Sequence, residues 1–362
     1  MNYFTHKKRV GIITWHYYPN FGSALQTYAL FTTLKALGTK PLIINYKNPK
    51  YNIDSFFKTL IKRIIGSTIG VFNKHRKYSF IRFWQKIKYT KKVYTNSTID
   101  TDKFDCVVCG SDQIWAPNVF NPVYFLSFVK NNSIKKISYA PSIGLNDIPD
   151  SLVDCYSNLL KDFSDISIRE ETGKELLRQK CNINKITTVL DPTFLLDVDE
   201  YRKIEKKVNI KNRFIFCYFL NQNHNYYETV INYAVRNNLM VVGCSANKDD
   251  SKWLGDYGWI GPQEFLWLID HAECIFTDSY HGCIFSLLFH KKLLVLKRFN
   301  DFDPISQNSR IIQLDKWFDL SNNFIEQFET SKEVRHNDIA YFEKKLIDAR
   351  KISFDFLEKA LK

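Results

Sequence analysis

The clearest sign of chemistry is the segment CIFTDSYHGCIFSLLF, which begins at Cys274. Its first residues predict a buried strand and its last residues an apolar helix, so His281 lies at a strand-to-helix junction. Imidazole exchanges protons near neutral pH, which suits proton transfer, whereas the alternative is a buried structural histidine. The neighbouring candidates are Asp278, the hydroxyl-bearing Ser279 and Tyr280, and Gly282, which lets a ligand approach the backbone.

Arg169 occupies a similar place in the segment SIREETG, at the end of one strand and before an acidic helix start. A guanidinium there can present two N–H donors to a carboxylate or phosphate. The alternative is an ion pair with Glu170 or Glu171, although neighbours on a strand end point apart.

Two further loops follow predicted strands. In the first, Asn20, Gly22 and Ser23 lie between the strand and a helix expected at 23–37, where Ser23 can cap and free backbone N–H groups favour an anion. A turn and cap without a ligand is the alternative. In CGSDQIW, Gly110 and Ser111 reach the same sheet edge, with Asp112 as a base, a hydroxyl-binding group or a helix cap.

Strand-like and helix-like segments alternate through most of the chain, which predicts an α/β protein with parallel sheets covered by helices. We expect the first-half strands at 10–15, 41–46, 104–109, 136–140, 166–169 and 187–190, and the second-half strands at 214–220, 240–244, 274–277 and 293–297. A charged stretch near 198–212 separates the halves. The prediction is two Rossmann-like domains, 1–200 and 201–340, then a helix at 341–362. Two such halves resemble the glycosyltransferase-B (GT-B) architecture, whose ligand lies in a cleft between facing strand ends.

The net charge of +13 is concentrated in one segment. From Ser55 to Ile99 there are eleven lysines and arginines and no acidic residue, interleaved with apolar residues at helical spacing. This basic insertion, at about 55–95, is either a solvated surface or a peripheral patch for an anionic membrane. Nucleic acid is disfavoured because no recognition motif accompanies the charge.

Composition places the chain among globular proteins, with 45% hydrophobic and 25% charged residues. We find neither an apolar run long enough to span a membrane nor the pattern of a cleavable leader, so we expect a cytoplasmic location. Peripheral attachment to the inner face of the membrane is expected only if the basic insertion is a membrane patch. Cys106 and Cys109 form a CxxC, but no second pair of ligands exists and the run reads as a buried strand. We expect neither disulfides nor an obligatory metal.

Six blocks together resemble the polysaccharide pyruvyl transferase family: GIITWHYYPNFGSALQTYAL, VVCGSDQIW, SYAPSIG, SIREETG, VLDPTF and TDSYHGCIFSLLF. The resemblance implies a GT-B-like fold and transfer of the pyruvyl group of phosphoenolpyruvate, the donor substrate, to two sugar hydroxyls. The products are a pyruvate ketal and phosphate. The implied acceptor is a precursor of exopolysaccharide or capsule, including lipid-linked oligosaccharides, and no cofactor is implied.

The resemblance also assigns roles. His281 matches the family's functional histidine and Arg169 its cleft arginine, while Asp112 or Asp278 is expected to activate an acceptor hydroxyl. Members often carry arginine directly before the His-Gly pair, where this chain has Tyr280. Another cation must then hold phosphate, and the candidates are Arg310, Lys297 and Arg298.

Two other functions compete with this prediction. A glycosyltransferase of similar architecture would need an acid for the ribose hydroxyls of a nucleotide sugar, and Glu264 or Asp270 could serve. A binding protein that has lost catalysis is the second rival, which the presence of Arg169 and His281 disfavours.

Overall fold

The computed structural model describes residues 7–48, 69–220, 224–245, 257, 259–296, 308–320, 323–325 and 338–362. The chain forms two compact units. Unit 1 comprises residues 1–69, 84–196 and 349–362, and unit 2 comprises residues 70–83 and 197–348. Residues 55–68 of the predicted basic segment and the cations Lys297 and Arg298 lie outside the described residues.

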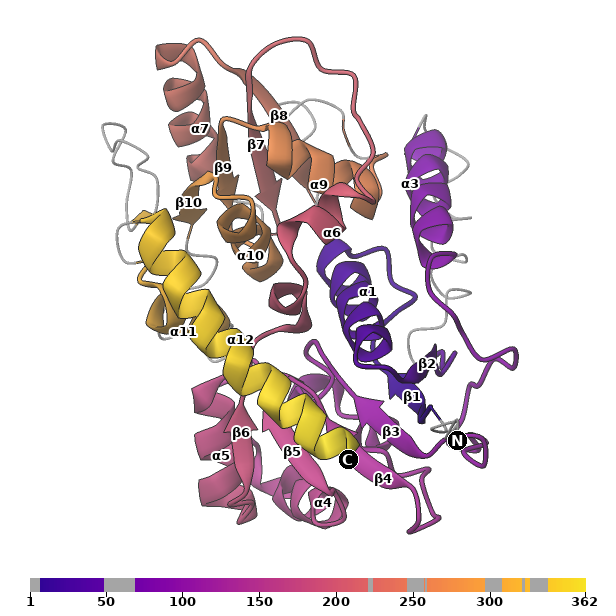
Figure 1. Ribbon diagram of the computed structural model, residues 1–362. Helices are drawn as coiled ribbons and strands as arrows, with labels where there is room; N and C mark the ends of the chain where they lie inside the picture. The colour runs from indigo at the N-terminus through magenta and orange to yellow at the C-terminus, as the bar shows by residue number, and fades with distance from the viewer. Residues whose placement is uncertain are drawn as a thin grey trace, which may run out of the picture. The chain divides into compact units, whose positions relative to one another are not determined.

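Unit 1 is built on a six-stranded parallel sheet with the order β2-β1-β3-β4-β5-β6 (Figure 1). The strands are β1 (Arg9–Ile13), β2 (Lys40–Ile43), β3 (Cys106–Cys109), β4 (Lys135–Ser138), β5 (Asp165–Ile168) and β6 (Ile186–Thr188). The chain goes from β1 to β2 on one side and then returns to β3 on the other side of β1, so the order reverses between β1 and β3. Loops that leave β1 and β3 therefore meet at the switch point where open α/β sheets bind ligands.

Alternate residues of the central strands pack into cores on opposite faces of this sheet. Val10, Ile12 and Val108 belong to a core with α1 (Phe21–Ala36) and the end of α12 (Ile339–Leu361). The other core contains Ile13 and Val107 and is covered by α4 (Asp150–Leu160) and α5 (Glu171–Cys181). Burial on both faces explains why these strands are continuously apolar.

The CxxC of β3 follows the same alternation. Cys106 lies in the core beneath α1, and Cys109 lies in the core beneath α4 and α5. Residues three apart on a strand point to opposite faces, so these two thiols cannot bind one metal ion. The interpretation of this motif as a buried strand is confirmed.

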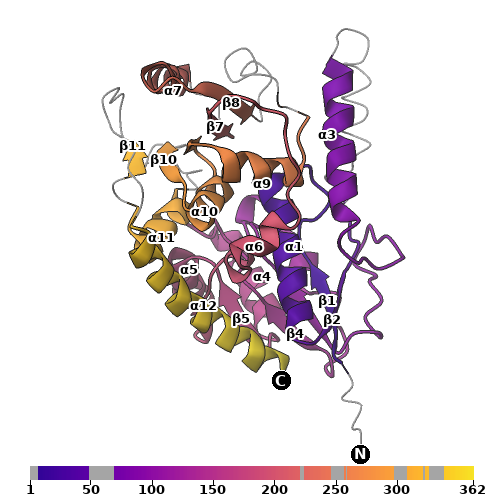
Figure 2. The same ribbon diagram turned by 45° about the horizontal axis from the view of Figure 1, so that its top comes forward.

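Unit 2 has a five-stranded parallel sheet with the order β11-β10-β9-β7-β8. Its strands are β7 (Phe214–Phe219), β8 (Met240–Ser245), β9 (Cys274–Thr277), β10 (Lys292–Leu296) and β11 (Phe324–Ile325). One face is covered by α7 (His224–Arg236), which shares a core with Ile215 and Phe276 (Figure 2). On the other face, Phe265 of α9 (Pro262–His271) contacts Phe216 of β7 and Phe285 of α10 (Tyr280–Leu288).

The remaining helices are short or lie at the margins of the units. They are η2 (Pro117–Val119), η3 (Pro122–Phe125), η4 (Pro192–Leu195), α6 (Val198–Arg202), α11 (Ser309–Phe318) and α3 (Ile69–Trp84) within the basic segment. Among the helices described, none combines the length and the apolar character needed to cross a membrane.

Every predicted strand has a counterpart in the structure, displaced by at most two residues at most ends, and the sheets are parallel as expected. The predicted start of α1 was wrong by two residues. The helix begins at Phe21, and Asn20 rather than Ser23 is its cap, because the Asn20 side chain accepts a hydrogen bond from the Ser23 backbone N–H. Ser23 is thereby left in the first turn, with its hydroxyl available for another partner.

Candidate active site

Arg169 follows β5 and is buried, with 2% of its surface exposed. Its Nη1 donates to Oδ2 of Asp191 over 2.8 Å, and its Nε lies 3.9 Å from Oε2 of Glu170. Asp191 follows β6, the neighbouring strand, so both groups leave the sheet at adjacent carboxyl ends. The main ion pair is therefore with Asp191, and not with Glu170 or Glu171, the partners considered as the alternative to ligand binding. Substrate binding by Arg169 stays a prediction.

The loop after β3 enters the same network. Ser111 is fully buried, and its hydroxyl donates to the Ala140 carbonyl (2.7 Å) and contacts Oδ2 of Asp191 (3.2 Å). Gly110 has a φ of +130°, and a Cβ there would overlap the carbonyl oxygen of Tyr139. Only glycine can make this turn, which carries the chain from the strand into the buried network.

Asp112, the next residue, joins this loop to α1. Its Oδ2 accepts a hydrogen bond from the Ser23 hydroxyl over 2.5 Å, and its Oδ1 accepts from the backbone N–H of Gln113. Its φ is +73°, in the left-handed region that non-glycine residues rarely adopt. The structure thus brings together Ser23 and Asp112 at the switch point of the sheet, with a carboxylate that already accepts a hydrogen bond from a hydroxyl.

The sequence interpretation missed two residues in this region. Asp191 is the main acidic partner of Arg169, and His16 is buried in the loop after β1. Burial lowers the pKa of His16 to about 4, against the smaller opposing effect of its hydrogen bond with the Thr14 carbonyl. His16 is therefore neutral at physiological pH. An acidic residue directly after a strand, as in VLDPTF, was the signal that could have identified Asp191.

In unit 2, the segment after β9 forms a compact turn into α10. The Thr277 hydroxyl donates to the Tyr218 carbonyl, and Ser279 caps α10 by accepting from the backbone N–H of Gly282. A Cβ on Gly282 would overlap the Thr277 hydroxyl oxygen, so glycine is required at this position. The result is a rigid junction that places His281 in the first turn of α10, with 7% of its surface exposed.

Asp278 and Arg310 complete the polar groups around this turn. Asp278 is 2% exposed, and its Oδ1 accepts from the Leu220 backbone N–H over 2.7 Å. Arg310 lies in the first turn of α11, and its guanidinium carbon is 5.8 Å from the ring centre of Tyr280. A cation from a separate helix therefore lies against the residue that replaces the arginine expected before His281.

Glu264 and Asp270 were the acids that a nucleotide-sugar site would need. Glu264 is 3% exposed; its two oxygens accept from the Gly261 backbone N–H (3.0 Å) and from Nζ of Lys206 (2.7 Å). Asp270 is held by two donors of Arg202, at 2.9 and 3.2 Å. Both carboxylates are thus engaged in cap and ion-pair contacts within unit 2.

Within the described part of the chain, one group has metal-ligating atoms close together. Oxygen or nitrogen atoms of Glu205, Asp270 and His271 lie within 4.8 Å of one another. Burial, and secondarily the charge of Asp270, raise the pKa of Glu205. Because Arg202 already neutralises Asp270, the observed geometry is that of an ion-pair cluster.

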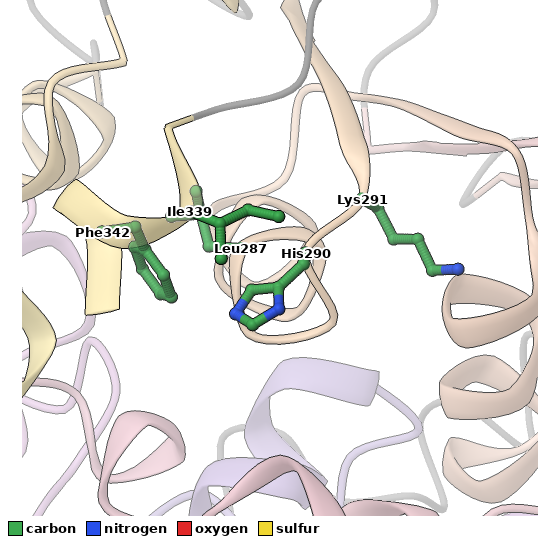
Figure 3. A pocket seen from close by; sticks show the side chains of 5 residues that line it. All are labelled: Leu287, His290, Lys291, Ile339 and Phe342. Carbon is green, nitrogen blue, oxygen red and sulfur yellow. The ribbon is translucent and has the colours of Figure 1, made fainter.

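A small hollow at the other end of α10 is lined by Leu287, His290, Lys291, Ile339 and Phe342 (Figure 3). Nε2 of His290 lies 2.7 Å from Oε1 of Glu343 on α12. Residue 287 is roughly 9 Å along the helix axis from residue 281, at the rise of an α-helix. The hollow therefore lies away from the carboxyl end of β9, where the candidate residues gather.

Solved structures with similar architecture include sugar-nucleotide enzymes. A UDP-N-acetylglucosamine 2-epimerase from Rickettsia bellii is 12% identical, with a TM-score of 0.51 over 98% of this chain and 96% of that one. A glycosyltransferase from Rickettsia africae ESF-5 is 11% identical, with a TM-score of 0.50 over 98% and 99%. These likenesses establish a GT-B fold of two Rossmann-like domains.

Comparison with curated proteins gives no significant match. The family model described as polysaccharide pyruvyl transferase matches residues 20–298, from the cap of α1 to just beyond β10. The match includes Ser23, Asp112, Arg169 and the turn that holds His281. By this match over most of its length, the chain belongs to the polysaccharide pyruvyl transferase family.

Proposed function

We propose that this protein transfers the pyruvyl group of phosphoenolpyruvate to two hydroxyls of a sugar in a cell-surface polysaccharide precursor. The products are a cyclic pyruvate ketal and inorganic phosphate. The observation that carries the proposal is the placement of His281 in the first turn of α10, within the family match and in contact with Tyr280, whose ring lies near the Arg310 guanidinium.

The reaction balances without a cofactor. A proton adds to the methylene carbon of phosphoenolpyruvate, and the resulting cation at the adjacent carbon is attacked by a sugar hydroxyl, which loses its proton. The C–O bond to phosphate then breaks, a second hydroxyl attacks the same carbon, and its proton is released. The protein must therefore supply an acid, a base and a binding site for the departing phosphate.

Unit 2 offers groups suited to the phosphate. The first turn of an α-helix directs backbone N–H groups outward and carries a partial positive charge, which favours an anion at the start of α10. Arg310 adds a full charge and a planar fork of donors next to this turn. In our proposal, Arg310 replaces the arginine that relatives carry before the histidine, and His281 moves protons at the donor.

A carboxylate is expected to activate the acceptor hydroxyl by accepting its proton. Asp112 accepts a hydrogen bond from the Ser23 hydroxyl, the geometry that an acceptor hydroxyl would also need. Asp278 has one oxygen committed to the Leu220 backbone and stands three residues before His281. We favour Asp112 for the acceptor and a positioning role for Asp278, which holds the turn after β9 to the end of β7. Arg169, paired with Asp191, is expected to support the loop after β3.

Donor binding can be tested without knowing the acceptor. Phosphoenolpyruvate should protect the wild type against thermal unfolding, by about 2.7 kcal/mol at a hundredfold excess over its Kd. Arg310→Gln should lose most of this protection, and Arg310→Lys should recover only part of it because lysine lacks the fork. Arg236→Gln, an exposed arginine on α7, is the matched control and should behave like the wild type.

Catalysis by His281 needs a separate assay. Phosphate release from phosphoenolpyruvate is measured with a panel of hexosides that offer pairs of free hydroxyls. His281→Ala should lower the rate by a factor of about 100 to 10,000, the usual range for a general acid or base. His290→Ala, at the other end of α10, should leave the rate per folded molecule nearly unchanged. A rate for His281→Ala within a few-fold of wild type would show that the role assigned to His281 is wrong.

The same thermal measurement separates the rival functions. Protection by UDP-sugars and not by phosphoenolpyruvate would indicate a glycosyltransferase, and protection by neither would indicate a protein without this catalytic activity. The engagement of Glu264 and Asp270 in cap and ion-pair contacts favours the pyruvyl transferase.

A further inference from the structure

Helix α3, at the upper right of Figure 1, has two faces of different character. Phe80 and Phe83 are fully buried. The opposite face exposes Lys77 and Arg82 together with 65% of Tyr78. Ile81, with 37% of its surface exposed, lies on the same face at helical spacing. The side chains of Tyr78 and Ile81 are therefore exposed to solvent between two basic side chains.

The buried face fixes this helix on unit 2. A Cβ built on Gly261, the residue before α9, would lie only 2.5 Å from Cβ of Ser79, so the two backbones approach closely there. On the same face, the Arg76 guanidinium lies 5.9 Å from the ring centre of Phe80. The exposed face consequently keeps a defined orientation on the unit.

The charge of this stretch of the chain has a single sign. No acidic residue occurs from Ser55 to Ile99, and the exposed lysines that follow α3 in the chain are Lys86, Lys88, Lys91 and Lys92. Helix α12 provides a contrast, since it also exposes apolar side chains, Ile347 and Ile352, but carries Asp348 and Asp355 beside its lysines. Exposed apolar residues without acidic neighbours in the sequence thus distinguish α3 from α12.

We propose that the exposed face of α3, formed by Lys77, Tyr78, Ile81 and Arg82, docks on an anionic lipid surface. Each basic side chain gains from the negative potential of phosphatidylserine or phosphatidylinositol headgroups. The phenol ring and the isoleucine gain by entering the boundary between headgroups and acyl chains, as in other amphipathic helices that lie in the interface. A nucleic acid would use the charges but not Ile81.

Docking of this face is independent of the chemistry proposed for His281. If both hold, the enzyme would work beside acceptors carried on membrane lipids. The binding measurement below uses no donor or acceptor, so its failure would leave the transferase proposal untouched.

The test is cosedimentation of the full chain with phosphatidylcholine vesicles, with and without phosphatidylserine. We expect binding to the anionic vesicles at low salt and none to the neutral ones. Lys77→Gln/Arg82→Gln should lower the partition coefficient by a factor on the order of 25, about fivefold for each charge removed. Tyr78→Ser/Ile81→Ser, which keeps every charge, should also weaken it severalfold.

Lys351→Gln/Lys359→Gln, two exposed lysines of α12, is the matched control and should bind like the wild type. Circular dichroism confirms that each variant is folded. Absence of wild-type binding at low salt would overturn the proposal. A second result would also overturn the proposal: Tyr78→Ser/Ile81→Ser binds like the wild type, and duplex DNA displaces the protein from vesicles. The surface would then bind polyanions in general.

Discussion

The buried pair of Arg169 and Asp191 gives the sharpest test of how unit 1 is held together. Asp191→Asn keeps the shape of the side chain but removes its charge. Oδ1 can still accept from the backbone N–H and hydroxyl of Thr193, as it does now at 3.0 and 2.7 Å. The new amide nitrogen, however, would place an N–H donor against the donor Nη1 of Arg169, while the Ser111 hydroxyl, which donates to the Ala140 carbonyl, could accept from the amide.

The expected loss of folding free energy in Asp191→Asn follows from the burial of the ion pair and the distance between its charges. Side-chain exposure is 1% for Arg169 and 0% for Asp191, so water cannot replace the lost carboxylate. Two charges at this separation attract by about 6 kcal/mol at an effective dielectric constant near 20. Breaking buried pairs costs about 3–5 kcal/mol, and we expect the lower end because Glu170 keeps a carboxylate 3.9 Å from Nε.

Urea unfolding measures this cost, with hydrogen exchange of β5 and β6 amides identifying the transition of unit 1. Asp154→Asn, an exposed residue of α4, is the control and should change the free energy of unfolding by less than about 0.5 kcal/mol. The double variant Arg169→Met/Asp191→Leu should be less destabilised than the sum of its two single variants, since it leaves no unpaired charge. If Asp191→Asn cost no more than the control, the ion pair would not hold unit 1 as we infer.

Two other predictions concern the loops after β1 and β3. Gly110→Ala should destabilise the protein by more than about 3 kcal/mol or abolish soluble expression, because its Cβ would overlap the Tyr139 carbonyl at a φ of +130°; a thermal midpoint near that of the wild type would contradict this geometry. His16 has a folded pKa of about 4 against an ordinary value near 6.5, so the unfolded chain binds the proton first and stability is lost as pH falls through this window. The loss should reach about 3 kcal/mol by pH 4, and His16→Asn should flatten the pH profile of the urea midpoint, whereas parallel profiles would refute the assignment.

Much of the fold was predictable because local patterns encode local structure. Runs such as CVVC and FIFCYF are apolar on both sides and short, which indicates parallel strands, and every predicted strand was found. The start of α1 was misplaced because Asn20 and Ser23 are both good caps, and only the backbone conformation of Asn20 decides between them.

The candidate site was predictable in position but not in its contacts. His281, Arg169 and Asp112 each follow a strand closely in the sequence. Because all strands of a parallel sheet run in one direction, these residues must lie at the carboxyl edges of their sheets. The partner of Arg169 could not be read in this way. Asp191 is 22 residues away in sequence and becomes its neighbour only because β5 and β6 pair side by side.

The sequence by itself determined the alternation of strands and helices, the two Rossmann-like halves and the motifs that mark the family, since these depend on periodicity and turn residues close in the chain. Only the tertiary structure decided which groups meet. It paired Ser23 with Asp112, brought Arg310 to Tyr280 beside His281, and gave α3 one buried and one exposed face. Such contacts join elements tens of residues apart, and packing against the rest of each unit, not local propensity, selects them.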